Sequence, residues 1–174
     1  MRIALILPIA ALMLAPARAQ TAADPEHAAL ARLAGEYSVR QSFWTEPGAA
    51  PKIDQGSASF AVVLGRQLRQ TLRIPDPAKP FEGLGYIGYD NATGRYFSTW
   101  MDVNFPGLIV AEGGRDASGT YEFRGSTAVG GGKPAIVVRE VLRVADADHF
   151  TYEYFEPRDG KEMLTVRLEY SRRQ

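Results

Sequence analysis

The stretch FEGLGYIGYDNATGRYFSTWMD, residues 81–102, contains the pattern that decides the fold. Two hydrophobic runs, residues 84–89 and 95–103, flank the string DNATG, which is rich in residues that favour a turn. In the second run, one side is formed by Tyr96, Ser98, Trp100 and Asp102, and the other by Phe97, Thr99 and Met101. Alternation with a period of two is typical of a β-strand. The stretch therefore predicts two strands joined by a turn.

The glycines of this stretch also fit the spacing G-x-G-x-x-G, at Gly83, Gly85 and Gly88. A dinucleotide-binding loop requires a strand before these glycines and a helix after them. Here Tyr89 and Asp90 lead into a turn and another strand, so the helix is missing. Glycines within a strand mark bends, bulges or close approach of another group. We interpret these three as the means by which a small barrel bends.

The same period of two recurs along most of the chain. It is cleanest where Leu68, Gln70, Leu72 and Ile74 alternate with polar residues, and it returns in runs that begin near Tyr37, Ala58, Tyr121, Phe150 and Leu164. One helix is expected, which starts at Asp24-Pro25-Glu26, an N-cap followed by proline at the first helical position, and ends at Gly35. No connection is long enough to carry a crossover helix, so neighbouring strands should be antiparallel.

These features predict an all-β protein, an up-and-down antiparallel β-barrel of about ten strands with one short N-terminal helix that plugs or flanks one end. Nearly every strand has one apolar face, which indicates a sheet curled around its own interior, and closure removes exposed strand edges. A sandwich of two sheets is the alternative. A barrel of this size has room for one small ligand.

The first 19 residues resemble a signal peptide rather than part of the domain. Arg2 supplies the positive start, residues 3–14 form an apolar run too short to span a membrane, and Ala17-Arg18-Ala19 fits the cleavage rule. We therefore expect residues 1–19 to be removed and residues 20–174 to form a single domain, exported to the periplasm or the medium of a bacterium. A retained membrane anchor is the alternative.

Composition excludes several classes of function. The leader contains two arginines and no acid, so the remainder carries 18 basic and 20 acidic residues with no block of like charge. Nucleic-acid binding needs a basic face and is disfavoured. The absence of cysteine excludes disulfides, thiol catalysis and thiolate metal sites. The two histidines, His27 and His149, have no partner at ligand spacing, so neither a metal site nor a cofactor is expected.

The parity of the strands predicts which side chains point inward. If the face of Trp100 is the inner one, an indole and the carboxylate of Asp102 lie side by side in the interior; the alternative is an ordinary core tryptophan and an aspartate that caps a turn. The same parity adds the polar residues Gln41, Gln70, Glu140 and Glu156 and the tyrosines Tyr86, Tyr152, Tyr154 and Tyr170. An aromatic pocket with a few fixed polar groups is typical of a small-molecule site. Arg139 could pair with the acids, but its strand is apolar on both sides, so its direction is left open.

Several motifs together resemble one bacterial family. HAALARLAGEYSV, EPG, FEGLGYIGYDNATGRYFSTWMD, VREV and DGKEMLTVRLEYSRR occur in the order found in the family catalogued as domain of unknown function 1579, over residues 27–173. The residues that match are Gly35, Trp44, Gly83, Tyr89, Asp90, Tyr96, Trp100, Asp102, Arg139, Gly160 and Tyr170. Tyr37 departs from a frequent tryptophan, Arg66 departs from a usual glycine, and the GGGKP loop is short. The resemblance implies a lipocalin-like, or calycin-type, barrel without an established activity.

Three functions follow as hypotheses. The leading one is an exported protein that binds a small, largely apolar or amphiphilic molecule; Tyr86, Tyr96, Trp100 and Tyr154 would line the site, and Asp102 with Arg139 or Gln70 would fix a polar end. Barrels related to the family bind fatty acids, retinoids or haem, but haem is not carried over because a ligating histidine has no counterpart. The second is a cyclase, isomerase or hydrolase that uses inward carboxylates such as Asp102 and Glu156. The third is a structural or interaction module of the envelope.

Overall fold

The computed structural model describes residues 24–128, 131–132 and 134–174, so the expected signal peptide lies outside the described residues. The elements in chain order are α1 (Pro25–Ala31), β1 (Gly35–Phe43), β2 (Lys52–Val63), β3 (Gln67–Ile74), β4 (Phe81–Asp90), β5 (Arg95–Asp102), β6 (Phe105–Arg115), β7 (Tyr121–Thr127), β8 (Ile136–Val144), β9 (His149–Arg158) and β10 (Lys161–Arg172). In the described part, no helix is long and apolar enough to cross a membrane.

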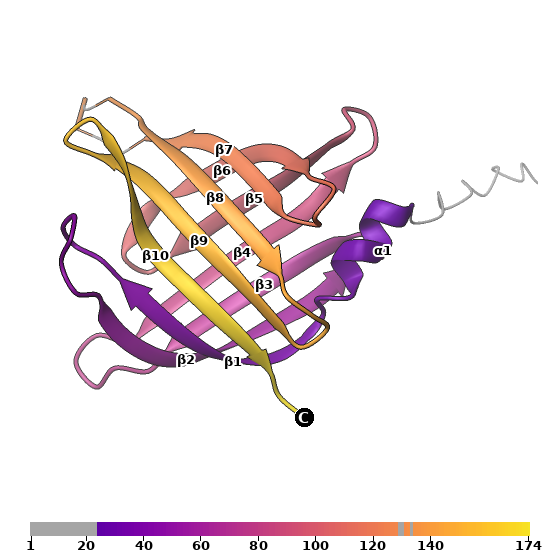
Figure 1. Ribbon diagram of the computed structural model, residues 1–174, viewed down its shortest axis with the longest axis horizontal. Helices are drawn as coiled ribbons and strands as arrows, with labels where there is room; N and C mark the ends of the chain where they lie inside the picture. Colours follow the sequence, from indigo (N-terminus) through magenta and orange to yellow (C-terminus); the bar gives the residue numbers. More distant parts are fainter. Residues whose placement is uncertain (1–23, 129–130, 133) are drawn as a thin grey trace, which may run out of the picture.

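The ten strands form one closed antiparallel barrel in which each strand pairs with its neighbours in sequence, and β1 closes the ring on β10 (Figure 1). Val39 lies opposite Tyr170 across this closing pair, and Tyr37 lies opposite Arg172. The prediction of an up-and-down barrel of about ten strands with a short N-terminal helix is confirmed, and the sandwich alternative is wrong.

The stretch 81–102 forms the adjacent strands β4 and β5, as its pattern predicts. The turn between them ends at Gly94, whose φ of +69° favours glycine, and the Gly94 amide donates to the carbonyl of Asp90 at 2.8 Å. Tyr89 lies opposite Tyr96, and Gly83 lies opposite Asp102. Register and burial place the face of Trp100 on the inside of the barrel, where Tyr96 and Ser98 are each 3% exposed.

The helix α1 covers one end of the barrel, beside β3 and β4 (Figure 1). Asp24 caps it, because its carboxylate accepts from the amides of Glu26 and His27 at 3.1 Å. Leu30 is fully buried in the core below. The expected end at Gly35 is wrong: the helix ends at Ala31, and Gly35 is the first residue of β1. With only seven residues, the helix depends on packing rather than on its own stability.

The core fills the end of the barrel next to the helix. Tyr37, Phe60, Phe150 and Tyr170 pack together there, edge to face or, for Phe150 and Tyr170, stacked at 4.4 Å between ring centroids. Aromatic pairs in these arrangements add to the free energy gained by burial alone. This end is therefore packed solid, so the space for a ligand must lie towards the opposite end.

Candidate functional site

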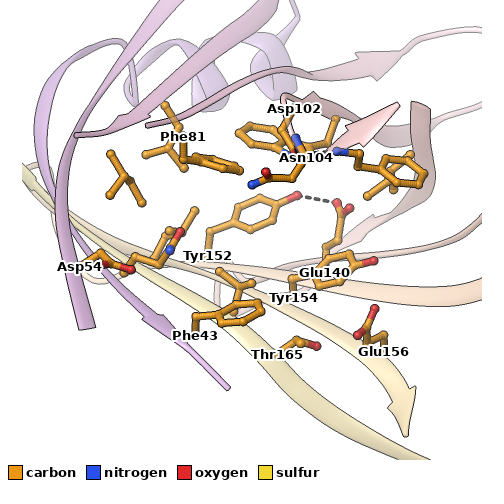
Figure 2. A pocket seen from close by; sticks show the side chains of 18 of the residues that line it. Phe43, Asp54, Phe81, Asp102, Asn104, Glu140, Tyr152, Tyr154, Glu156 and Thr165 are labelled. Carbon is orange, nitrogen blue, oxygen red and sulfur yellow. Dashed lines mark hydrogen bonds between the residues drawn. The ribbon is translucent and has the colours of Figure 1, made fainter. Parts of the chain in front are cut away.

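A cavity of about 670 Å³ opens at the end of the barrel opposite to α1, where the connections β1–β2, β3–β4, β5–β6 and β9–β10 lie (Figures 1 and 2). Its walls are mainly aromatic and aliphatic, and they include Phe43, Leu72, Ile74, Phe81, Trp100, Phe105, Ile109, Tyr152, Tyr154, Val166 and Leu168. Volumes of this order are usual for pockets that bury a small molecule.

One wall of the cavity is the indole of Trp100, which lies against the backbone of β4. A Cβ atom added at Gly83 would fall 2.1 Å from Trp100 Cζ2, and one at Gly85 would fall 2.9 Å from Cε3. Gly83 and Gly85 therefore leave room for a flat indole rather than for a phosphate. The Trp100 Nε1–H donates to Asp102 Oδ2 at 3.0 Å, and Asp102 Oδ1 accepts from the amides of Asn104 and Phe105. Asp102 thus caps a turn, as the alternative had it, and also fixes the indole.

The most unusual group of the site is Glu140 on β8, which lines the cavity but is only 2% exposed. Its Oε2 accepts from the hydroxyl of Tyr152 at 2.5 Å, and that hydroxyl lies 3.0 Å from Ser98 Oγ (Figure 2). Burial raises the pKa of Glu140, and the hydrogen bonds from Tyr152 and Ser98 oppose the shift without cancelling it. A carboxylic acid held in its neutral form can donate a hydrogen bond or a proton to a molecule in the cavity.

The floor of the cavity contains a second polar contact, between β3 and β10. The amide Nε2 of Gln70 donates to the hydroxyl of Tyr170 at 2.7 Å, and both side chains are buried. Burial raises the pKa of Tyr170, and the bond from Gln70 lowers it by less. Because its amide group is hydrogen-bonded to Tyr170 of the packed core, Gln70 forms part of the floor of the cavity.

The mouth carries most of the charge. Lys52 Nζ lies 3.1 Å from Asp54 Oδ1, and Arg158 Nη2 lies 2.5 Å from Glu156 Oε1. Asp76 and Lys79, on the loop before β4, complete this charged rim. Tyr154 stands just inside it (Figure 2), and burial raises the pKa of its hydroxyl. Mixed charge around an apolar interior would admit an amphiphilic molecule as well as an apolar one.

The structure brings four of the seven predicted site residues to the cavity: Gln70, Trp100, Asp102 and Tyr154. Tyr96 also points inward, but it lies at the helix end, where its hydroxyl donates to the carboxylate of Glu26. The placement of Tyr86 in the interior is wrong, because it lies opposite Arg69 and Thr99 on the outer side of β4, between the inward positions Gly85 and Ile87.

Arg139, whose direction the sequence leaves open, also lies on the outer face, so it does not fix a polar end with Asp102. Its Nε and Nη2 donate to the two oxygens of Glu162 at 2.8 and 2.6 Å, and its guanidinium lies 3.9 Å from the centroid of the Phe155 ring. These contacts link β8 to β9 and β10 on the outer face of the barrel. The ion pair raises the pKa of Arg139 and lowers that of Glu162.

We predict that Arg139→Ala leaves the occupancy of the cavity unchanged and lowers the free energy of unfolding by about 1 kcal/mol, as expected for an ion pair on the outer face whose arginine also packs on a ring. Urea denaturation measures the stability, and titration with an apolar fluorescent probe measures binding. A loss of binding without a loss of stability would contradict the outward placement.

The alternation of the strands predicts Glu140 and Tyr152 as inward residues, but it does not show that they bond to each other or that Ser98 is a partner. The signal was present in the parity of β5, β8 and β9, yet parity does not show which strands of a barrel face one another. The alternation does not predict the charged rim around Lys52 and Asp54, because these residues lie at a strand end, where the pattern of apolar and polar residues gives no signal. In the described ranges, no group of three or more histidine, aspartate or glutamate side chains is arranged to hold a metal ion.

Comparison with known proteins gives the family and the fold. The sequence model of the family described as "Protein of unknown function (DUF1579)" matches residues 22–172. No curated protein matches the chain by sequence. The crystal structure of Rv2717c from M. tuberculosis is similar, with a TM-score of 0.63 and 17% identity over 87% of this chain and 99% of that chain. A redesigned β-barrel has a TM-score of 0.44 and 11% identity over 84% of this chain and 96% of its own.

Proposed function

The chain belongs to the DUF1579 family of proteins of unknown function, and we propose that it is an exported barrel that binds a small, largely apolar molecule in its open cavity. The observation that carries this proposal is the cavity of about 670 Å³ inside a barrel whose other end is packed solid. An interior without function could be filled by larger side chains, as the helix end is, and filling would add to stability.

The lining supports the same function. Aromatic and aliphatic side chains from many strands face the cavity, and inner polar groups such as Gln70, Ser98 and Glu140 are fixed by hydrogen bonds. Such a composition holds an apolar body by burial and orients it through one or two hydrogen bonds. Export is supported by the residue pattern of the leader and agrees with a chain that contains no cysteine.

The proposal predicts that filling the cavity abolishes binding. Val166→Trp places an indole into the cavity from β10, whereas the matched Val137→Trp places the same side chain on the outer face of β8, where Val137 is 62% exposed. We expect Val166→Trp to weaken binding of the uncharged fluorescent probe N-phenylnaphthylamine by roughly tenfold or more, which corresponds to about 1.4 kcal/mol. Val137→Trp should bind as the native protein does.

Native mass spectrometry of the protein purified from its producing cells complements this test, because a bound molecule adds a mass that disappears on denaturation. Equal probe affinity in the two tryptophan variants would place binding outside the barrel and overturn the proposal. Circular dichroism of both variants shows whether the barrel is retained.

A further inference from the structure

Among the described residues, the buried carboxyl of Glu140 has no counter-ion. No lysine or arginine forms an ion pair with it in the part of the chain that the structure describes, and its hydrogen-bond partners are the neutral hydroxyls of Tyr152 and Ser98. Buried carboxylates in folded proteins are normally paired with a cation or remain protonated, because an isolated charge is costly away from water. Glu140 therefore lacks a cationic partner, and a ligand could supply one.

The remaining charges of the cavity cannot fill this role. Lys52, Lys79 and Arg158 lie at the mouth, away from Glu140, and Lys52 and Arg158 are already engaged by Asp54 and Glu156. Arg139, although next to Glu140 in sequence, points outward to Glu162. As far as the structure describes the chain, the inner part of the cavity thus has an acid and no base, which favours a cation and disfavours an anionic head group such as a carboxylate.

We infer that the cavity takes an amphiphilic amine, whose ammonium group pairs with Glu140 while its apolar body lies along the aromatic wall towards the mouth. This inference rests on the proposed binding function and names the chemical class of its ligand. The ammonium would lie near the Tyr152 hydroxyl, and the alkyl or aryl part would contact Trp100 and Leu168, both of which line the cavity.

The groups that face Glu140 determine its protonation. They are Tyr152 and Tyr154 on β9, Phe123 on β7 and Ser98 on β5, none of which carries a positive charge. Burial raises the pKa of Glu140, which shifts its equilibrium in the empty cavity towards the neutral acid. Binding of an ammonium ion shifts the same equilibrium back towards the carboxylate, and any proton that Glu140 releases passes to the buffer.

Three probes of equal chain length, octylamine, octanol and octanoate, test the inference by isothermal titration calorimetry near neutral pH. We expect octylamine to bind roughly tenfold or more tightly than octanol, since charge pairing in a buried site outweighs a neutral hydrogen bond, and octanoate to bind most weakly. The dependence of the octylamine heat on the ionisation enthalpy of the buffer then measures how many protons are released on binding.

Glu140→Gln keeps the shape and an acceptor for Tyr152 but removes the charge, so it should abolish the preference for octylamine while octanol binds as before. Glu162→Gln, on the outer face of the barrel, is the matched control and should retain the preference. If octanol binds but octylamine shows no preference, or if Glu140→Gln retains it, the amine inference is overturned while the binding function stands. If none of the three probes binds, both are overturned.

Discussion

Gly113→Ala is expected to lower the free energy of unfolding by roughly 2–4 kcal/mol, because the added methyl group has nowhere to go. Gly113 lies on β6 between Tyr96 of β5 and Phe123 of β7. A Cβ atom at this position would fall 1.7 Å from the carbonyl oxygen of Glu122 and 2.8 Å from the Cα of Phe123. Both contacts are with backbone, which cannot move aside without breaking the pairing of β6 and β7.

The next residue provides the matched control. A Cβ atom added at Gly114 meets nothing within 4 Å, so Gly114→Ala should change the stability little. Urea denaturation monitored by tryptophan fluorescence measures both variants, and an unchanged dependence on denaturant shows that they unfold alike. Equal losses from the two substitutions would mean that β6 tolerates a side chain at Gly113 and that the close approach to β7 is not rigid.

The fold could be predicted from the sequence because the alternation is local. In β3, Leu68, Leu72 and Ile74 are at most 4% exposed, as a period of two requires. Closure of the barrel is not a local feature, because it depends on β1 pairing with β10 across nearly the whole chain. The alternation gives each strand one apolar face, but a sandwich has that feature too, and only the long-range pairing distinguishes them.

The site was only partly predictable, and the errors have physical causes. In β4 the inward positions opposite Asp102 and Trp100 are the glycines Gly83 and Gly85, so Tyr86, which the pattern predicts to lie inside, is an outer residue. In β8 the outward Val141 is 1% exposed, so the hydrophobic pattern loses its period and the direction of Arg139 cannot be read. In β10 a bulge at Thr165 shifts the register, which places Leu164 opposite the outer residue Phe155.

The protonation of Glu140 should appear in the pH dependence of stability. Its pKa in the folded barrel is raised above the usual 4.5 by burial. Below pH 4.5 the carboxyl of Glu140 is protonated in both the folded and the unfolded protein, so its burial takes nothing from the free energy of unfolding. As the pH rises further, the unfolded chain loses the proton while the folded barrel keeps it, so the native protein loses up to about 1.4 kcal/mol of stability per pH unit until the folded pKa is reached.

Glu140→Gln cannot titrate, so its stability relative to the native protein should increase steadily as the pH rises from about 4.5, as measured by urea denaturation across a series of buffers. Glu162→Gln is the control of opposite sign. The Arg139 guanidinium lowers the pKa of Glu162, so its contribution is present above pH 4.5 and is lost as the pH falls through the lowered pKa. The stability of Glu162→Gln relative to the native protein should therefore decrease as the pH rises. A difference between Glu140→Gln and the native protein that stays constant with pH would show that Glu140 titrates as in water, and its burial beside Tyr152 would then carry no electrostatic cost.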